Sequence, residues 1–183
     1  MVRPLIRPGR EADIAALLEV ERRASALLLG HGAHDLFAMH SLSQDDLSRG
    51  VCNESLRVAQ LGGQAVGFAL YGELDGHAHL FEMDVLPEYG RQGIGSALLE
   101  DVCVQAWRRD FRAITLTTLR DVPWNAPFYA KRGFSELAEA AWGERLREIV
   151  ARERMLGFPM QLRVVMRRRL SFSHREKVAR SDG

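Results

Sequence analysis

The spacing of apolar residues along this chain predicts a mixture of helices and strands. Ile94, Leu98, Val102 and Ala106 recur every four residues, which is the period of one face of an amphipathic helix. Shorter apolar runs bounded by glycine or proline predict strands instead. Strands are expected at residues 2–7, 55–61, 64–71, 78–85, 113–119, 134–138 and 160–170, and helices at 11–26, 95–109, 126–131 and 146–156.

The order of these segments predicts an α/β fold with a mixed sheet. Gly62-Gly63 and Asp75-Gly76 are two-residue turn signals, so the three strands that they join are expected to be antiparallel. A helix then separates strand 78–85 from strand 113–119. This arrangement predicts a parallel pair of strands joined by a right-handed crossover.

Residues 2–170 are expected to form a single domain, because no linker or repeat interrupts the pattern. Residues 171–183 are polar and lack periodicity, so they are expected to form a disordered tail.

The most specific pattern occupies residues 82–97. The strand ends at Pro87, which has no backbone N–H to donate within a sheet. Gly90, Gly93 and Gly95 follow, and glycine allows positive φ angles and close approach of the backbone. The helix begins directly after them, so its free N–H groups and the positive end of its dipole are expected to point into the loop beside Arg91. This arrangement predicts a phosphate-binding loop.

Two common phosphate-binding motifs do not match this loop. A dinucleotide fingerprint requires a third glycine after Gly93-Ile94-Gly95, and Leu98 stands at that position. A Walker A loop requires a Gly-Lys-Ser/Thr triplet, which does not occur in the chain.

The loop resembles the acetyl-CoA loop of the GNAT superfamily of N-acetyltransferases. That loop follows a strand ending in Val-x-Pro and reads Gln/Arg-x-x-Gly-x-Gly/Ala; this chain supplies Val85-Leu86-Pro87 and then residues 90–95. Gly90 stands where the family has its first Gln or Arg, and the arginine is displaced to Arg91.

Two further segments support the resemblance. Asn125 and Tyr129, followed by Gly133-Phe134, are similar to the family's second conserved block. Arg163-Val164-Val165-Met166 resembles its final strand. By order of elements the resemblance covers residues 2–170, and it implies a GNAT-like sheet with N-terminal antiparallel strands, a splayed parallel pair at the loop and C-terminal antiparallel strands.

The resemblance implies acetyl-CoA as the cosubstrate. The main chain of Met83 and Val85 would pair with the pantetheine arm, and the Val85 N–H would stabilise the oxyanion. Asn125 either bonds the pantetheine amides or caps its own helix. The pyrophosphate would be held by the N–H groups of Arg91, Gln92, Gly93, Ile94, Gly95 and Ser96.

Transfer of an acetyl group to an amine also requires proton transfer. An alkyl ammonium with a pKa of about 10 is almost fully protonated at neutral pH, so a base or a water relay is needed. Glu82 and Asp84 lie on one face of the strand, and Glu82 is the preferred base; the alternatives are a solvated side chain or a partner for an arginine. Tyr129 is expected to protonate the departing thiolate, unless it is only a core aromatic.

Composition narrows the class of protein further. The net charge is +1, which gives no electrostatic basis for nucleic-acid binding. Two cysteines and no apolar leader or membrane-length run favour a cytoplasmic location. No cysteine lies in either motif block, so direct transfer in a ternary complex is expected. The acceptor would be a primary amine of a small molecule or a protein, and a homodimer is possible.

Several residues remain open to more than one interpretation. His31, His34 and His40 lack typical metal-ligand spacing, so loop or substrate contacts are favoured and no metal is expected. Trp124 either forms a wall of the acceptor pocket or has an ordinary packing role. Arg167 and Arg169 are expected on the solvated face of an edge or surface strand.

A protein that binds coenzyme A as a sensor or interaction module, without turnover, is the alternative function. The acceptor pocket is expected to come from residues 27–54 and 120–145.

Overall fold

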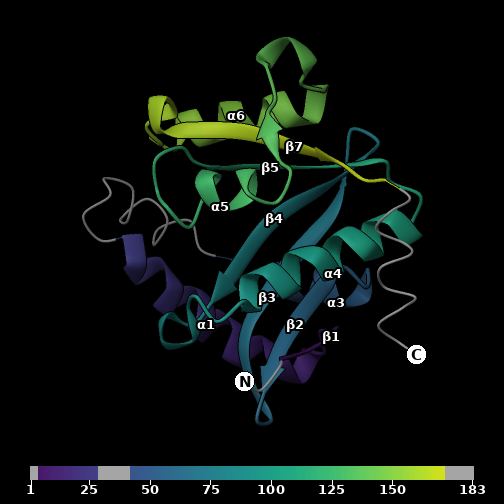
Figure 1. Cartoon of the computed structure of the whole chain (residues 1–183), viewed down its shortest axis with the longest axis vertical. Helices are drawn as coiled ribbons and strands as arrows, with labels where there is room; N and C mark the ends of the chain where they lie inside the picture. Colours follow the sequence, from purple (N-terminus) through teal and green to yellow (C-terminus); the bar gives the residue numbers. More distant parts are fainter. Residues whose placement is uncertain (1–3, 29–41, 172–183) are drawn as a thin grey trace. The chain divides into compact units, whose positions relative to one another are not determined.

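The computed structural model describes residues 4–28 and 42–171 (Figure 1). These residues divide into two compact units. The first lies within residues 1–72 and 80–102, and the second within residues 73–79 and 103–183. The single domain over residues 2–170 remains a prediction, and the tail that was expected to be disordered lies outside the described residues except for Ser171.

The first unit is built on antiparallel strands. Within it the strand order is β1-β2-β3-β4, and the β1–β2 and β2–β3 pairs are antiparallel. Gly62 and Gly63 have φ angles of 57° and 87°, so the predicted two-residue turn between β2 and β3 is confirmed. The strands are β1 (Leu5–Pro8), β2 (Leu56–Leu61), β3 (Gln64–Leu74) and β4 (His77–Val85).

Helices cover both faces of these strands. In Figure 1, α4 (Ile94–Arg108) lies in front of β2 and β3, whereas α1 (Ile14–Ser25) and α3 (Gln44–Cys52) lie behind them. The elements pack closely at two glycines, where a side chain would not fit without a shift of its neighbours. A Cβ on Gly50 of α3 would lie 2.6 Å from Leu70 Cδ1, and a Cβ on Gly67 of β3 would lie 2.7 Å from the carbonyl oxygen of Asp84. Gly67 therefore lets the end of β4 lie close to β3.

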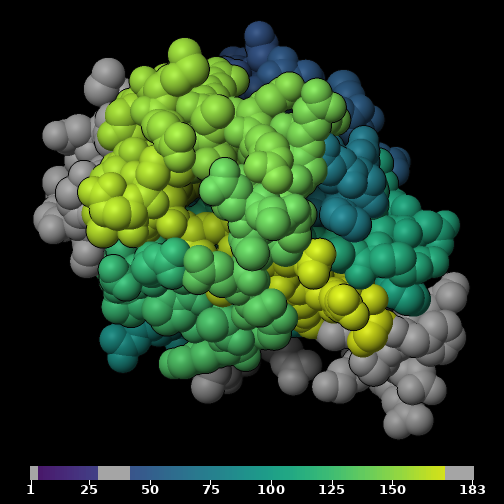
Figure 2. All heavy atoms as spheres, turned by 90° about the horizontal axis from the view of Figure 1, so that it is seen from above, coloured from purple at the N-terminus to yellow at the C-terminus, as the bar shows by residue number. Residues whose placement is uncertain are grey.

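The second unit contains the other strands. β5 (Ala113–Leu119) and β7 (Arg163–Arg169) are antiparallel over seven residue pairs, and β7 also pairs with the short β6 (Ser135–Glu136). The first residues of β4 lie next to β5, and these two strands are parallel, as predicted. Figure 2 shows β7, in yellow, between the green residues around α5 (Ala126–Ala130) and the lighter green residues that follow β6. The fold is therefore mixed α/β.

Helix α6 (Glu144–Met155) packs on the sheet of the second unit through Leu146 and Val150. Its N-terminus is capped from a distant part of the chain, because the carboxylate of Asp75 accepts the N–H groups of Arg145 (3.1 Å) and Leu146 (2.9 Å). A Cβ on Gly143 would lie 2.3 Å from Asp75 Oδ2, so this cap requires glycine at position 143. The β3–β4 turn thus fixes the start of α6.

A buried polar contact joins β4 to β5 in the same unit. His79 Nδ1 lies 2.8 Å from the hydroxyl oxygen of Thr115, and that hydroxyl lies within donating distance of the Ala78 carbonyl at 3.3 Å. The hydroxyl then accepts from the ring, so the hydrogen is on Nδ1. Burial lowers the pKa of His79 to about 4, against the opposing effect of Asp75, so the ring is neutral at neutral pH.

The described elements differ from the prediction in several places. Helix α3 was not predicted, although Ser43 and Asp46 form a capping box at its start. The last strand begins at Arg163 rather than at residue 160, because Met160–Leu162 forms a 3₁₀ turn. Of the expected edge or surface strand, the edge position is wrong, since β5 and β6 flank β7; Arg169 is exposed as expected, whereas Arg167 is half-buried.

Among residues 4–28 and 42–171, no helix has both the length and the apolar character needed to cross a membrane.

Candidate active site

The end of β4 presents two different faces. Val85 faces α4, because its Cγ2 and Leu98 Cδ1 both lie near the Cβ position of Gly67, at 3.1 and 3.4 Å. Glu82 and Asp84 alternate with Met83 and Val85 along the strand, so their side chains lie on the opposite face. All four residues are half-buried. Strand geometry therefore places the two carboxylates on one face.

The loop after β4 turns sharply before α4 begins. A 3₁₀ turn (Pro87–Tyr89) follows the strand, and the Gly90 N–H donates to the Pro87 carbonyl at 3.0 Å. Arg91 has φ 60° and Gly93 has φ 87°, so both adopt left-handed conformations. Gly90 has φ −59°, so of the two properties expected of these glycines it provides close approach and not a positive φ. It is glycine for space, because a Cβ there would lie 3.0 Å from the Pro87 oxygen.

The N-terminus of α4 opens onto this loop. The Ala97 N–H donates to the Gly93 carbonyl at 3.0 Å, and the N–H groups of Ile94 and Gly95 have no carbonyl four residues earlier within the helix. Ile94 is buried and anchors the helix start, whereas Arg91, Gln92 and Gly93 are exposed. Among the described residues, apart from Gly93 itself and its two chain neighbours, no atom lies within 4 Å of a Cβ placed on Gly93. The segment has the backbone donors, positive charge and open space that a phosphate group needs.

A cluster of three carboxylates lies on α1 and β4 in the first unit. The pKa of Asp84 is raised well above its ordinary value by burial, then by Glu82 and Glu21. Burial also raises the pKa of Glu21, although the Leu42 N–H donates to its Oε1 at 2.8 Å and favours the charged form. Asp84, which was the weaker alternative to Glu82 as a base, is therefore a carboxyl whose protonated form the structure favours.

Asp84→Asn is expected to stabilise the protein at high pH and to change little at pH 4. The folded protein retains the Asp84 proton at pH values where the unfolded chain has lost it, so the free energy of unfolding falls as pH rises above the unfolded pKa of about 3.9. Asparagine does not titrate, so the variant does not lose this free energy of unfolding as pH rises. Each kcal/mol of unfolding free energy corresponds to about 2–4 °C in Tm for a chain of this size. Thermal unfolding between pH 4 and 9 measures the difference.

The matched control for this variant is Asp110→Asn. Asp110 is exposed and has φ 66°, a conformation that asparagine tolerates well, so its replacement should leave the pH dependence of Tm unchanged. Equal pH profiles for Asp84→Asn and the unmodified protein would contradict the raised pKa.

The candidate acid and its neighbour lie in the second unit. Tyr129 on α5 is buried and packs edge-on against Phe128 and Phe134, with ring centroids 5.1 and 5.5 Å away. The rings hold Tyr129 in place whether or not its hydroxyl acts in catalysis. Asn125 stands at the N-cap of α5, but its side chain makes no capping hydrogen bond. The capping interpretation of Asn125 is therefore wrong.

The three histidines considered as metal ligands or substrate contacts are not tested by the structure. His31, His34 and His40 lie outside the described residues. Within residues 4–28 and 42–171, no group of three or more His, Cys, Asp or Glu side chains is arranged to hold a metal ion.

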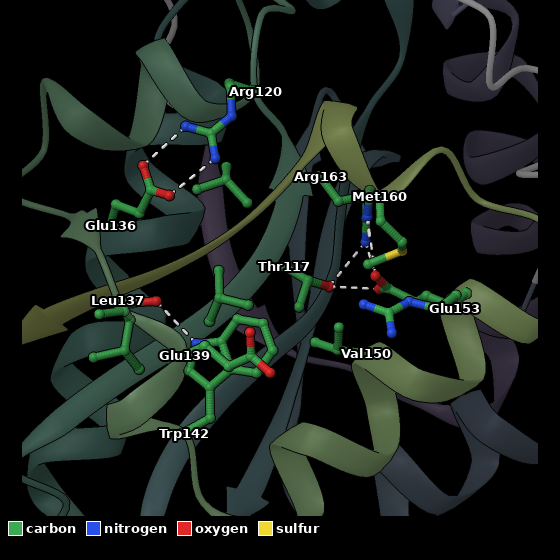
Figure 3. A pocket seen from close by; sticks show the side chains of 14 residues that line it. Thr117, Arg120, Glu136, Leu137, Glu139, Trp142, Val150, Glu153, Met160 and Arg163 are labelled. Carbon is green, nitrogen blue, oxygen red and sulfur yellow. Dashed lines mark hydrogen bonds and ion pairs between the residues drawn. The ribbon is translucent and has the colours of Figure 1, made fainter.

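Trp124 is 44% exposed, so it is not a core residue. The tryptophan that lines a cavity is Trp142, which the sequence did not single out (Figure 3).

The sequence also matches a family model. The model of the acetyltransferase (GNAT) family matches residues 21–134, which include β4, the glycine loop, α4, β5 and α5. The chain belongs to the GNAT acetyltransferase family. It is therefore an acyltransferase by class, and the resemblance of its loop and of its second block to this family is confirmed.

Solved structures of GNAT N-acetyltransferases have the same fold. N-acetylglutamate synthase from Neisseria gonorrhoeae, complexed with coenzyme A and N-acetyl-glutamate, gives a TM-score of 0.71 at 18% identity over 93% of this chain, which spans only 36% of that longer protein. PaiA N-acetyltransferase from Thermoplasma acidophilum, in complex with coenzyme A, gives 0.66 at 19% identity, covering 92% of this chain and 99% of that one. The ribosomal-protein-S18-alanine N-acetyltransferase from Escherichia coli gives 0.63 at 19% identity, covering 92% and 95%.

Proposed function

We propose that this protein transfers an acetyl group from acetyl-CoA to a primary amine, directly and within a ternary complex. The observation that carries the proposal is the open N-terminus of α4, with Gly93 at φ 87° and the guanidinium of Arg91 on the same exposed loop. Family membership and neighbours crystallised with coenzyme A support the choice of ligand. Neighbours named for acetylating a protein alanine or making N-acetylglutamate support an amine acceptor.

Each proposed site residue has a defined task in the reaction. Acetyl-CoA supplies an activated acetyl thioester when it is bound. The N–H groups of residues 91–96 hold its pyrophosphate, the main chain of Met83 and Val85 pairs with the pantetheine arm together with Asn125, and the Val85 N–H stabilises the developing oxyanion. Glu82 accepts a proton from the amine, and the Tyr129 hydroxyl donates one to the leaving sulfur.

The carboxylate cluster gives Glu82 a suitable environment for this task. Burial, then Glu82 and Glu21, raise the pKa of Asp84, which favours the protonated form of the carboxyl beside Glu82. We propose that Glu82 is the carboxylate of the two that acts as the base when the amine arrives as an ammonium.

Two measurements test the proposal together. Calorimetry with acetyl-CoA tests the binding loop, and release of free coenzyme A in the presence of a panel of amines and amino-acid esters tests turnover. Binding with amine-dependent release is expected. Binding without release for any amine would favour a sensor or interaction module instead, and absence of binding would exclude both functions.

Glu82→Gln is expected to lower kcat by about 100-fold at pH 6 and by much less at pH 9–10, with little change in acetyl-CoA affinity. The effect shrinks at high pH because the amine then arrives already deprotonated. A pH series of coenzyme A release measures it, and Glu19→Gln, on an exposed carboxylate of α1, is the control. An unchanged rate at every pH would remove Glu82 from the mechanism.

The proposal also includes a cytoplasmic location, consistent with two cysteines that form no disulfide in the described part of the chain, Cys103 being buried in α4. A homodimer is part of the proposal as well, and sedimentation or light scattering tests it.

A further inference from the structure

The second unit contains a cavity of about 300 Å³ (Figure 3). It is lined from β5, β7 and α6 and from the segment that follows β6. A cavity of this size is at the lower end of small-molecule sites, which suits a ligand the size of an amino acid.

One wall of the cavity is an internally satisfied polar network. Arg163 at the start of β7 donates to both oxygens of Glu153 on α6, at 2.5 and 3.1 Å, and also to the hydroxyl of Thr117 on β5, at 2.8 Å. The Thr117 hydroxyl in turn donates to Glu153 at 2.7 Å. Both charged side chains are nearly buried, so the network fixes α6 on the sheet and leaves the Glu153 charge neutralised.

The other carboxylates of the lining also have arginine partners. Glu136 accepts two hydrogen bonds of 2.9 Å from Arg120, and both bonds are visible in Figure 3. Glu139 lies 3.8 Å from Arg147. Each acidic side chain that lines the cavity is thus paired with a guanidinium.

Arg154 also lines the cavity, but unlike Arg120 and Arg163 it is not paired with a carboxylate among the described residues. Its side chain is exposed and makes no hydrogen bond or ion pair within the described part of the chain, although the residue lines the cavity. An arginine in the last turn of a helix also interacts favourably with the helix dipole, and Arg152 occupies the same turn. The helix dipole therefore explains why both arginines occur in the last turn of α6. It does not explain why Arg154 lines the cavity, because Arg152, in the same turn, does not.

The remaining lining supplies an apolar surface beside this charge. The indole of Trp142 is fixed by a hydrogen bond of 2.9 Å from its Nε1–H to the Leu137 carbonyl, and Leu137 and Val150 lie in the same lining (Figure 3). The cavity therefore combines one uncompensated guanidinium with a rigid apolar side.

We propose that this cavity binds the carboxylate of a small apolar amino acid, with Arg154 as its counter-ion and Trp142 against its side chain. A planar guanidinium matches a carboxylate with two parallel hydrogen bonds, which a neutral amide cannot reproduce. This inference rests on the proposed function in one respect: it makes the bound amino acid the amine acceptor. Binding itself does not require acetyl transfer.

The test uses the full chain without acetyl-CoA. Alanine, valine, leucine and phenylalanine, each beside its amide, are titrated while the indole N–H signals of the three tryptophans are followed by ¹H–¹⁵N NMR. Trp142→Phe assigns the reporter signal. At least one acid is expected to shift the Trp142 signal saturably, and its amide is expected to bind at least about tenfold more weakly.

Matched variants identify the anchor. Arg154→Gln is expected to weaken binding of the acid about tenfold or more, Arg154→Lys to weaken it less, and Arg152→Gln to leave it unchanged. Equal binding of acids and amides, equal effects of the two glutamine variants, or no shift of the Trp142 signal by any probe would overturn the proposal. Binding of an acid without coenzyme A release once acetyl-CoA is added would leave the cavity site intact and refute only its role as the acceptor site.

Discussion

Gly95→Glu is expected to reduce acetyl-CoA affinity by at least about 100-fold without destabilising the protein. Gly95 lies in the first turn of α4, where the helix presents N–H groups and the positive end of its dipole to the loop. A glutamate there would place a negative charge where the pyrophosphate is proposed to bind, and the two would repel each other. The same charge is favourable for the helix, because acidic residues stabilise the first turn and glycine is a poor helix former.

The opposite signs of these two effects make the experiment decisive. Calorimetry with acetyl-CoA reports the loss of affinity, and thermal unfolding should show an equal or higher Tm. Gly95→Gln is the control for size without charge, and it should lose less affinity than the glutamate variant. If Gly95→Glu bound acetyl-CoA as tightly as the unmodified protein, the pyrophosphate would not lie at this helix terminus.

Tyr129→Phe is expected to lower kcat by about 100-fold or more, with acetyl-CoA affinity within about twofold of the unmodified protein. The substitution removes only the hydroxyl, so the edge-on contacts of the ring with Phe128 and Phe134 remain. If the hydroxyl protonates the leaving sulfur, its loss acts on the chemical step and not on binding of the donor. Single-turnover release of coenzyme A measures that step.

Tyr71→Phe is the control for this variant. Tyr71 is also buried, on β3 in the first unit, so the control removes a buried hydroxyl that has no proposed catalytic task. Similar losses of turnover in both variants would indicate a structural effect, and an unchanged rate in Tyr129→Phe would return Tyr129 to the role of a core aromatic.

The glycine loop illustrates how far local sequence predicts a site. The strand end at Pro87, the turn and the start of α4 all depend on residues close together in the chain, so their order was predicted correctly. The sequence left open which glycine adopts a positive φ and which provides close approach. Arg91 takes a left-handed conformation that favours glycine, whereas Gly90 does not, because the path of the turn past the Pro87 carbonyl decides the matter.

The candidate carboxylates show a different limit. The strand period placed Glu82 and Asp84 on one face, which is a local property. The raised pKa of Asp84 depends in addition on burial and on Glu21, which comes from α1, more than 60 positions earlier. No spacing in the sequence indicates that contact.

By itself, the sequence determined most strands and helices of the mixed α/β fold and the family, and it predicted a phosphate-binding loop, because these follow from periodicity and from short motifs. The tertiary structure decided how distant residues combine. Asp75 caps α6 from 70 residues away, and Arg163, Glu153 and Thr117 form one wall of the cavity from three different elements. Such contacts arise only when the elements pack, since nothing in the local chain specifies which side chains will then become neighbours.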